Sequence, residues 1–201
     1  MYRAPVQEIA FTLSKVAGLG EVLADPRHAE VSEDLVLAIL EEAGRFAGER
    51  IAPISEIGDQ VGAKWEKGEV TMPPGWREAY HAWAEGGWNS LTADPEHGGQ
   101  GLPMMLQAAA MEMWNSGSMA FAIGPTLTVG AIEALEKHAS DALKATYLPK
   151  LVSGEWSGTM NLTEPQAGSD LNALRARAER NDDGTYRIFG QKIFITYGEQ
   201  D

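Results

Sequence analysis

The sequence contains no cysteine and few histidines, and its charge is strongly unbalanced towards acid. Without cysteine the chain has no disulfide, no thiolate metal site and no cysteine nucleophile. Its four histidines lie at positions 28, 81, 97 and 138 without the spacing of metal ligands, so we predict no metal site. Sixteen basic against 29 acidic residues give a formal net charge of −13. That balance argues against a nucleic acid or an anionic membrane as partner.

Long apolar runs are also missing from the sequence. No stretch approaches 18 uninterrupted apolar residues, and the N-terminus lacks the apolar core and cleavage pattern of a signal peptide. We therefore predict no membrane span and a cytoplasmic location. The hydrophobic content of 44% and charged content of 22% are ordinary for a globular protein. A length of 201 residues suits one domain with part of a second.

Helical periodicity dominates the chain up to about residue 155. Residues 1–31 are interpreted as an N-terminal extension with one short amphipathic piece. From Ser32, an N-cap type of residue, apolar side chains recur at helical steps until Pro53, which we expect to end the helix. The predicted apolar stripe consists of Leu35, Ile39, Ala43, Phe46 and Ile51.

Further helices are predicted downstream of a glycine- and lysine-containing loop at residues 58–74. One runs from Trp76 to Glu85 and stops at two glycines. A glycine-rich ordered loop, "TADPEHGGQGLP", precedes two or three more helices, the last of them capped by Ser140. The Ala- and Met-rich segment 104–113 is expected to be well buried.

The pattern changes to β-structure after Glu155. A strand ending at Thr163 is expected, and "LRARAER", "NDDGT" and "YRIFGQKIFITYG" indicate two further strands joined by a turn. The predicted fold class is α+β, with an extension (1–31), an all-α N-terminal domain (32–155) and the first part of an antiparallel β domain (156–201). We expect the chain to be truncated, since it stops directly after a strand and a small sheet needs more strands.

The stretch "TMNLTEPQAGSDL" is the main candidate for chemistry. The expected strand is followed by a loop of small residues. In this loop Pro165 fixes a turn, and Gly168 allows a ligand to approach the backbone closely. Ser169 adds a hydroxyl donor and acceptor. On the residues alone, a plain turn, an anion cradle and part of a cofactor site all remain open.

Several motifs in order resemble the acyl-CoA dehydrogenase family of flavoproteins. They are "DPEHGGQGLP", "LTEPQAGSD" and, one hairpin later, "GQKIFITYG". The N-terminal "YRAPVQEIAFTL" is similar to the start of a longer-chain subgroup that includes 3-methylmercaptopropionyl-CoA dehydrogenases. The chain departs from the usual pattern at Asn161, at Gln166 and at Phe194, where many members have tryptophan. Phenylalanine keeps a flat apolar face for stacking but loses the indole donor.

The resemblance implies an FAD site built from both motif regions. Thr163 would hydrogen-bond the polar edge of the flavin, and Thr196 would donate towards flavin N5. Gly168 and Ser169 would meet the FAD diphosphate, with Ser169 also near the CoA of the substrate. The full set of implied cofactor-binding residues is Met160, Asn161, Leu162, Thr163, Gly168, Ser169, Phe194, Ile195 and Thr196.

The implied reaction is α,β-dehydrogenation of an acyl-CoA, with electrons passed to an electron-transfer flavoprotein. A glutamate base is expected in a C-terminal helical domain that this chain lacks, so no catalytic residue is assigned here. Glu164 is expected to support the loop structurally, and Lys192 to be solvated or salt-bridged. The resemblance also implies a homo-oligomer, a dimer or tetramer, when full length. An acyl-CoA oxidase and a non-catalytic flavin-binding relative are the alternatives, and we expect little FAD binding by this chain alone.

Overall fold

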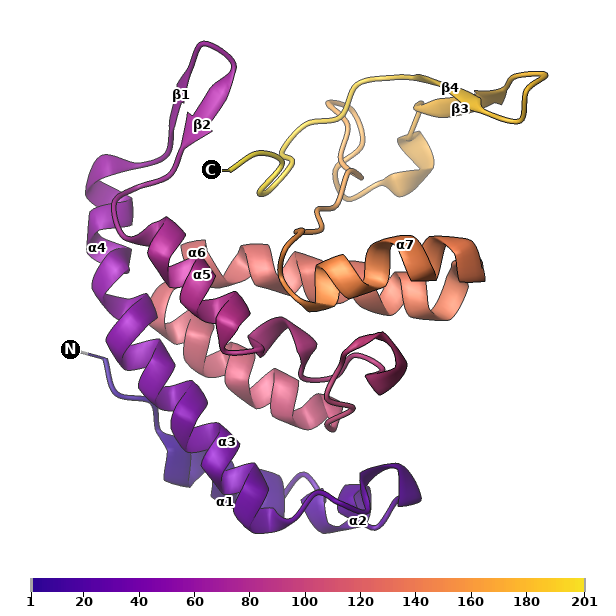
Figure 1. Cartoon of the computed structure of the whole chain (residues 1–201). Helices are drawn as coiled ribbons and strands as arrows, with labels where there is room; N and C mark the ends of the chain where they lie inside the picture. Colours follow the sequence, from indigo (N-terminus) through magenta and orange to yellow (C-terminus); the bar gives the residue numbers. More distant parts are fainter. Residues whose placement is uncertain (1, 201) are drawn as a thin grey trace. The chain divides into compact units, whose positions relative to one another are not determined.

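The computed structural model describes residues 2–200, which divide into two compact units. The larger unit comprises the chain up to Gly158 together with the last residues from Glu199, and the smaller one is Thr159–Gly198. Seven α-helices lie in the described part of the larger unit: α1 (Val6–Lys15), α2 (Leu19–Leu23), α3 (Glu33–Phe46), α4 (Ala52–Val61), α5 (Trp76–Glu85), α6 (Met104–His138) and α7 (Asp141–Val152) (Figure 1).

Shorter elements connect these helices and build the smaller unit. The larger unit also holds η1 (Pro26–His28), the π-helix η2 (Ala47–Ile51), β1 (Lys64–Glu66), β2 (Glu69–Thr71), η3 (Trp88–Ser90) and η4 (Pro95–His97). The smaller unit holds η5 (Leu171–Ala173), β3 (Arg177–Arg180) and β4 (Tyr186–Phe189). Both strand pairs, β1–β2 and β3–β4, are antiparallel. The predicted α+β class, with a helical part followed by antiparallel strands, is confirmed.

The first long helix begins as predicted but does not end at Pro53. The Ser32 hydroxyl accepts a hydrogen bond from the Leu35 N–H (3.1 Å), which is the expected N-cap. After Phe46 the helix widens into one π-turn, η2, and continues as α4. Pro53 falls in the first turn of α4, where a missing N–H costs little. Figure 1 shows α3, η2 and α4 running on from one another in the violet part of the chain.

The buried face of α3 is offset from the predicted stripe. Leu35 is exposed and Ile39 only half-buried, while Val36 and Leu40 are buried. Ala43 was predicted correctly as part of the buried face, as were Phe46 and Ile51. Positions 35 and 36 lie about 100° apart around a helix, so both satisfy an apolar spacing rule, and the packing of α3 against α6 selects one of them.

The amphipathic piece predicted within residues 1–31 is α1, which packs against α3, and α2 follows it. Other elements were misassigned from the sequence. Residues 58–74 contain the end of α4 and the β1–β2 hairpin. The predicted strand ending at Thr163 is absent, and residues 190–198 are not a strand either. By contrast, α5 has the predicted bounds, and Gly87, with φ 70°, follows its last turn.

A cluster of aromatic side chains forms the centre of the helical unit. Trp83 of α5 is fully buried, with its ring centroid 4.2 Å from that of Trp114 and 6.0 Å from that of Phe46. Its indole N–H donates to Asn89 Oδ1 (2.8 Å), and the Trp114 N–H donates to the Ala43 carbonyl (3.2 Å). Apolar burial and satisfied polar atoms together hold α3, α5 and α6 in place.

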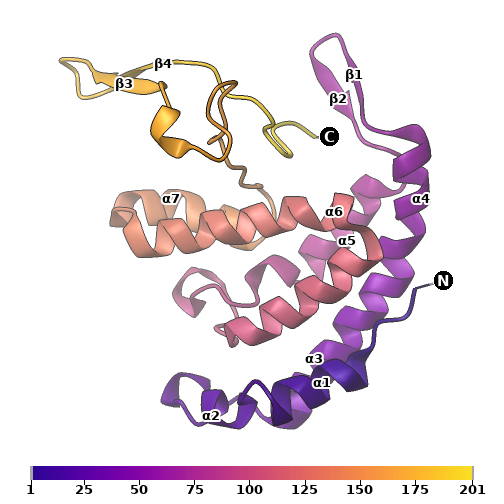
Figure 2. The same cartoon turned by 180° about the vertical axis from the view of Figure 1, so that it is seen from behind.

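Helix α6 bends at its middle. Ser118 has non-helical backbone angles (φ −162°, ψ 104°), and the two halves point in different directions (Figure 2). Within the described residues α6 is also the only helix long and apolar enough to cross a membrane, with a mean hydropathy of 1.4. Its kink and its packing against α3, α4 and α7 fit a core helix of the helical unit. The absence of a membrane span stays a prediction.

The glycine-rich loop before α6 is closely packed. A side-chain carbon at Gly99 would lie 1.9 Å from the Ala93 carbonyl oxygen, and neighbouring N–H groups bond back to Ser90 and Ala93. Backbone atoms cannot yield as a flexible side chain can. Only glycine fits this position.

We expect Gly99→Ala to lower the free energy of unfolding by about 3 kcal/mol, the upper end for overpacking, because backbone must shift. Gly20→Ala is the matched control, since Gly20 lies in α2 with nothing within 4 Å of an added carbon. It should be neutral or stabilising by about 0.5 kcal/mol. Urea unfolding followed by circular dichroism measures both. Equal effects of the two substitutions would contradict the packing of the loop.

Candidate functional site

The smaller unit brings together two of the predicted cofactor-binding segments, residues 160–163 and 194–196. The Ile193 N–H donates to the Thr163 carbonyl (3.0 Å), and the Thr159 hydroxyl donates to the Thr196 carbonyl (2.6 Å). These two hydrogen bonds join the segments near both of their ends. Residues 30 or more positions apart in the sequence therefore lie side by side.

A tight turn separates the first segment from Gly168 and Ser169. Glu164 and Ala167 exchange two backbone hydrogen bonds (3.1 and 3.0 Å), and both residues are buried. Gly168 and Ser169 follow on the exposed side, and a carbon added at Gly168 would meet nothing within 4 Å. The packing of this chain therefore gives no reason for glycine at position 168.

Glu164 holds this loop together, as predicted. Its carboxylate is buried, with 3% of the residue exposed. Four donors surround it: Lys192 Nζ (2.9 Å), the Arg175 N–H (2.8 Å), the Ala176 N–H (2.9 Å) and Gln166 Nε2 (2.6 Å). The hydrogen bond from Lys192, followed by the two backbone N–H groups, lowers the pKa of Glu164 from 4.5 to about 2. The side chain is therefore ionised and fully occupied at neutral pH, so it is a structural anchor.

The two segments carry backbone N–H groups that have no acceptor among the described residues. In the part that the structure describes, no N–H of residues 160–163 or 194–196 donates to another residue. Their side chains range from half-buried to exposed. Backbone N–H groups are almost always paired with protein, water or ligand. The segments can therefore donate several hydrogen bonds to the edge of a planar polar ligand.

Phe194 is both strained and exposed. Its φ of 56° lies in the left-handed region, which is unfavourable for a bulky residue, and 84% of the residue is exposed to solvent. Strain of this kind costs about 1–3 kcal/mol and clusters at ligand-binding sites. A ligand that stacks on the ring would offset the cost of exposing it.

Phe194→Gly is expected to separate stability from ligand binding. Relief of the left-handed strain offsets the chain entropy that glycine adds, so stability should change by less than about 0.5 kcal/mol. In the full-length protein the dissociation constant for FAD should rise roughly five- to tenfold through the lost stacking. Phe189→Gly, on the regular strand β4, should instead destabilise the protein by about 1 kcal/mol. Wild-type FAD affinity in Phe194→Gly would contradict the stacking role.

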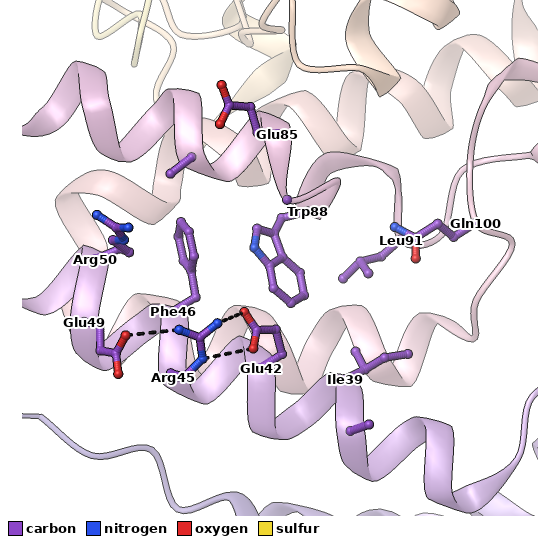
Figure 3. Close-up of a pocket in the computed structure, with 13 residues that line it drawn as sticks. Ile39, Glu42, Arg45, Phe46, Glu49, Arg50, Glu85, Trp88, Leu91 and Gln100 are labelled. Carbon is purple, nitrogen blue, oxygen red and sulfur yellow. Dashed lines mark hydrogen bonds and ion pairs between the residues drawn. The ribbon is translucent and has the colours of Figure 1, made fainter.

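The larger unit contains a cleft that the sequence did not reveal. It measures about 560 Å³ and is lined by residues of α3, η2, α5, η3 and the glycine-rich loop (Figure 3). Phe46 and Trp88 form its apolar wall, and Arg45 on the rim bonds to Glu42 and to Glu49 (3.2 Å). Both ion pairs of Arg45 are exposed, and pairs of this kind contribute little to stability. The lining residues come from two stretches of the chain, residues 38–50 and 82–100, so no single local motif marks them.

The fold of this chain is also found in solved structures of acyl-CoA dehydrogenases and of related flavoproteins. Butyryl-CoA dehydrogenase from Megasphaera elsdenii matches with a TM-score of 0.70 and 28% identity, covering 82% of this chain and 41% of that one. The structure described as "FAD complex of PigA" matches with a TM-score of 0.67 and 26% identity, covering 83% of this chain and 41% of that one. The architecture is thus one found in flavoproteins of this kind.

The family follows from the sequence comparisons. A family model described as "Acyl-CoA dehydrogenase, N-terminal domain" matches residues 34–155. The whole chain is 52% identical over 200 residues to 3-methylmercaptopropionyl-CoA dehydrogenase from Ruegeria pomeroyi. The chain belongs to the acyl-CoA dehydrogenase family, and the resemblance of its N-terminus to that subgroup extends over the whole chain. It spans about a third of the length of this relative (34%).

Proposed function

We propose that the full-length protein catalyses FAD-dependent α,β-dehydrogenation of an acyl-CoA thioester to the trans-2-enoyl-CoA. The observation that carries this proposal is the 52% identity to a named acyl-CoA dehydrogenase over the whole chain. The relative's name makes a methylthio-substituted acyl chain the first substrate to test. Electrons would pass to an electron-transfer flavoprotein, and the protein would act as a cytoplasmic homo-oligomer.

The geometry of the smaller unit fits the flavin. Unpartnered N–H groups at residues 160–163 and 194–196 suit the polar edge of the ring, and Phe194 presents a flat apolar face. The open backbone at Gly168 suits the approach of a phosphate, with the Ser169 hydroxyl beside it. Ser169 is also the proposed contact to the CoA of the substrate.

Each segment has a distinct role in this proposal. FAD supplies the redox chemistry when bound, and the chain orients it. Residues 160–163 line the ring, with Thr163 hydrogen-bonded to its polar edge. Phe194 and Ile195 cover the other side, and Thr196 donates towards flavin N5. The base that removes the substrate α-proton is a glutamate expected in the part of the protein beyond this chain.

Turnover by the full-length protein tests the proposal and its acceptor. The assay offers short, long and methylthio-substituted acyl-CoAs, with an electron-transfer flavoprotein or with air alone, and detects enoyl-CoA by mass spectrometry. Enoyl-CoA in amounts beyond one per bound flavin, formed only with the electron-transfer flavoprotein, is the expected result. Equal turnover in air with hydrogen peroxide would instead identify an oxidase. Bound FAD without turnover of any acyl-CoA would contradict the proposed reaction.

A further inference from the structure

Lys192 makes two hydrogen bonds that join the two halves of the candidate site. Its ammonium group donates to the Leu162 carbonyl (2.9 Å) and to Glu164 Oε1 (2.9 Å). The Lys192 side chain is 27% exposed and its partner Glu164 only 3%. The contact between ammonium and carbonyl therefore lies largely outside bulk water, where charge-assisted hydrogen bonds are strongest.

The carbonyl that Lys192 contacts belongs to the same peptide group as the Thr163 N–H. A positive charge on a peptide oxygen polarises the group and makes its N–H a stronger donor. That N–H has no acceptor among the described residues. The next carbonyl, that of Thr163, is fixed by the Ile193 N–H (3.0 Å). Lys192 thus holds the Leu162–Thr163 peptide directly, and Ile193 holds the peptide that follows it.

We propose that Lys192 is a positioning residue that polarises the Leu162–Thr163 peptide and thereby raises the reduction potential of the bound flavin. The inference rests on the proposed FAD site, in which Thr163 bonds the polar edge of the ring. Reduction adds negative charge to that edge, so a stronger donor there stabilises the reduced flavin more than the oxidised one. Glu164 has the supporting role, because it anchors the ammonium against the carbonyl.

The test measures the flavin reduction potential of the full-length holoprotein by equilibration with a reference dye. Lys192→Met should lower the ratio of reduced to oxidised flavin about tenfold at a fixed potential, a shift of about 30 mV for this two-electron couple. Lys192→Arg, which keeps the charge, should stay within threefold of wild type. Lys137→Met is the matched control, since it removes one charge from an exposed ion pair on α6 and should leave the potential unchanged.

Lys192→Met leaves Glu164 as a buried charge without its cation, so that variant can lose flavin through instability alone. The double variant Lys192→Met/Glu164→Gln removes both charges; it should lose part of its FAD, as Glu164→Gln alone does, and the flavin that stays bound should have the same lowered potential. A double variant that folds but takes up no flavin, or that keeps the wild-type potential, would overturn the inference. If acyl-CoA bleaches the flavin of the wild-type protein and only the shift in reduction potential is missing, the proposed function stands and the role of Lys192 does not. A wild-type protein that binds no flavin would overturn both the proposed function and this inference.

Discussion

Glu164→Ala is expected to convert the full-length protein into a folded but colourless apoprotein. Four donors converge on the Glu164 carboxylate, from Lys192, from Gln166 and from the backbone at residues 175 and 176. Without it, these partly buried donors lose their acceptor, which is costly for each one. The turn that sets the spacing between Thr163 and Gly168 then loses its anchor. The measurement is the ratio of flavin to protein absorbance after desalting.

Two further variants sharpen that result. Glu164→Gln keeps the shape, but one of its terminal atoms becomes a donor facing other donors, so we expect an intermediate loss of flavin. Glu66→Ala is the control, because Glu66 lies on the exposed β1 strand with only an exposed 3.5 Å ion pair to Lys67. It should retain full flavin. Stoichiometric FAD in Glu164→Ala would show that the loop does not need its anchor.

The same carboxylate predicts a pH dependence of flavin retention. The pKa of Glu164 is about 2 in the folded state, against an ordinary value of 4.5. A folded-state pKa below the unfolded value means that the stabilisation is complete above about pH 4.5 and is lost as the pH falls from there towards 2. Flavin fluorescence on acidification should show release in this window for wild type. Glu164→Gln should show no additional flavin release between pH 4.5 and 2. Identical pH profiles of wild type and variant would contradict the role of this carboxylate.

Trp83→Ala is expected to have the largest effect on stability. Trp83 is fully buried at the centre of the helical unit, against Trp114, Phe46 and Phe121. Truncation removes its contacts with all three rings and leaves a large cavity, which typically costs about 3–5 kcal/mol. Domains are stable by only about 5–15 kcal/mol, so this loss removes a large share of the free energy of unfolding. Urea unfolding followed by circular dichroism measures the change.

Trp65→Ala provides the matched comparison for that cavity. Trp65 lies on β1 and is 73% exposed, so the same side-chain truncation should change the free energy of unfolding by only about 0.5 kcal/mol. Trp83→Phe should be intermediate, because it keeps an aromatic ring but leaves Asn89 Oδ1 without its donor. A loss below about 1 kcal/mol in Trp83→Ala would contradict the central position of this cluster.

Local signals predicted the helical elements that depend on neighbouring residues. The Ser32 cap and the stop of α5 at two glycines arise from backbone chemistry within a few positions, and both are confirmed. Local signals did not predict that the helix continues through Pro53 or that α6 bends at Ser118. These two features depend on a π-turn and on tertiary packing, which no short window encodes.

The sequence singled out the loop of the candidate site but not the contacts within it. The loop can be recognised from its content of small residues. The structural role of Glu164 was predicted from its position before Pro165. Its pairing with Lys192, 28 positions away, depends on how the loop returns beside Thr163. The irregular backbone of residues 159–163 and 190–198 was mistaken for strands because alternating apolar residues fit either state. The roles of Met160, Thr163, Ser169 and Thr196 towards FAD stay predictions.

An anaerobic titration of the full-length protein with acyl-CoAs tests the central claim most directly. The absorbance of the oxidised flavin, at about 450 nm, is followed while short, long and methylthio-substituted acyl-CoAs are added. The account predicts that at least one class bleaches the flavin in the absence of oxygen and of any other reductant. A flavin that stays oxidised with every acyl-CoA would contradict the assignment of this protein as an acyl-CoA dehydrogenase in function.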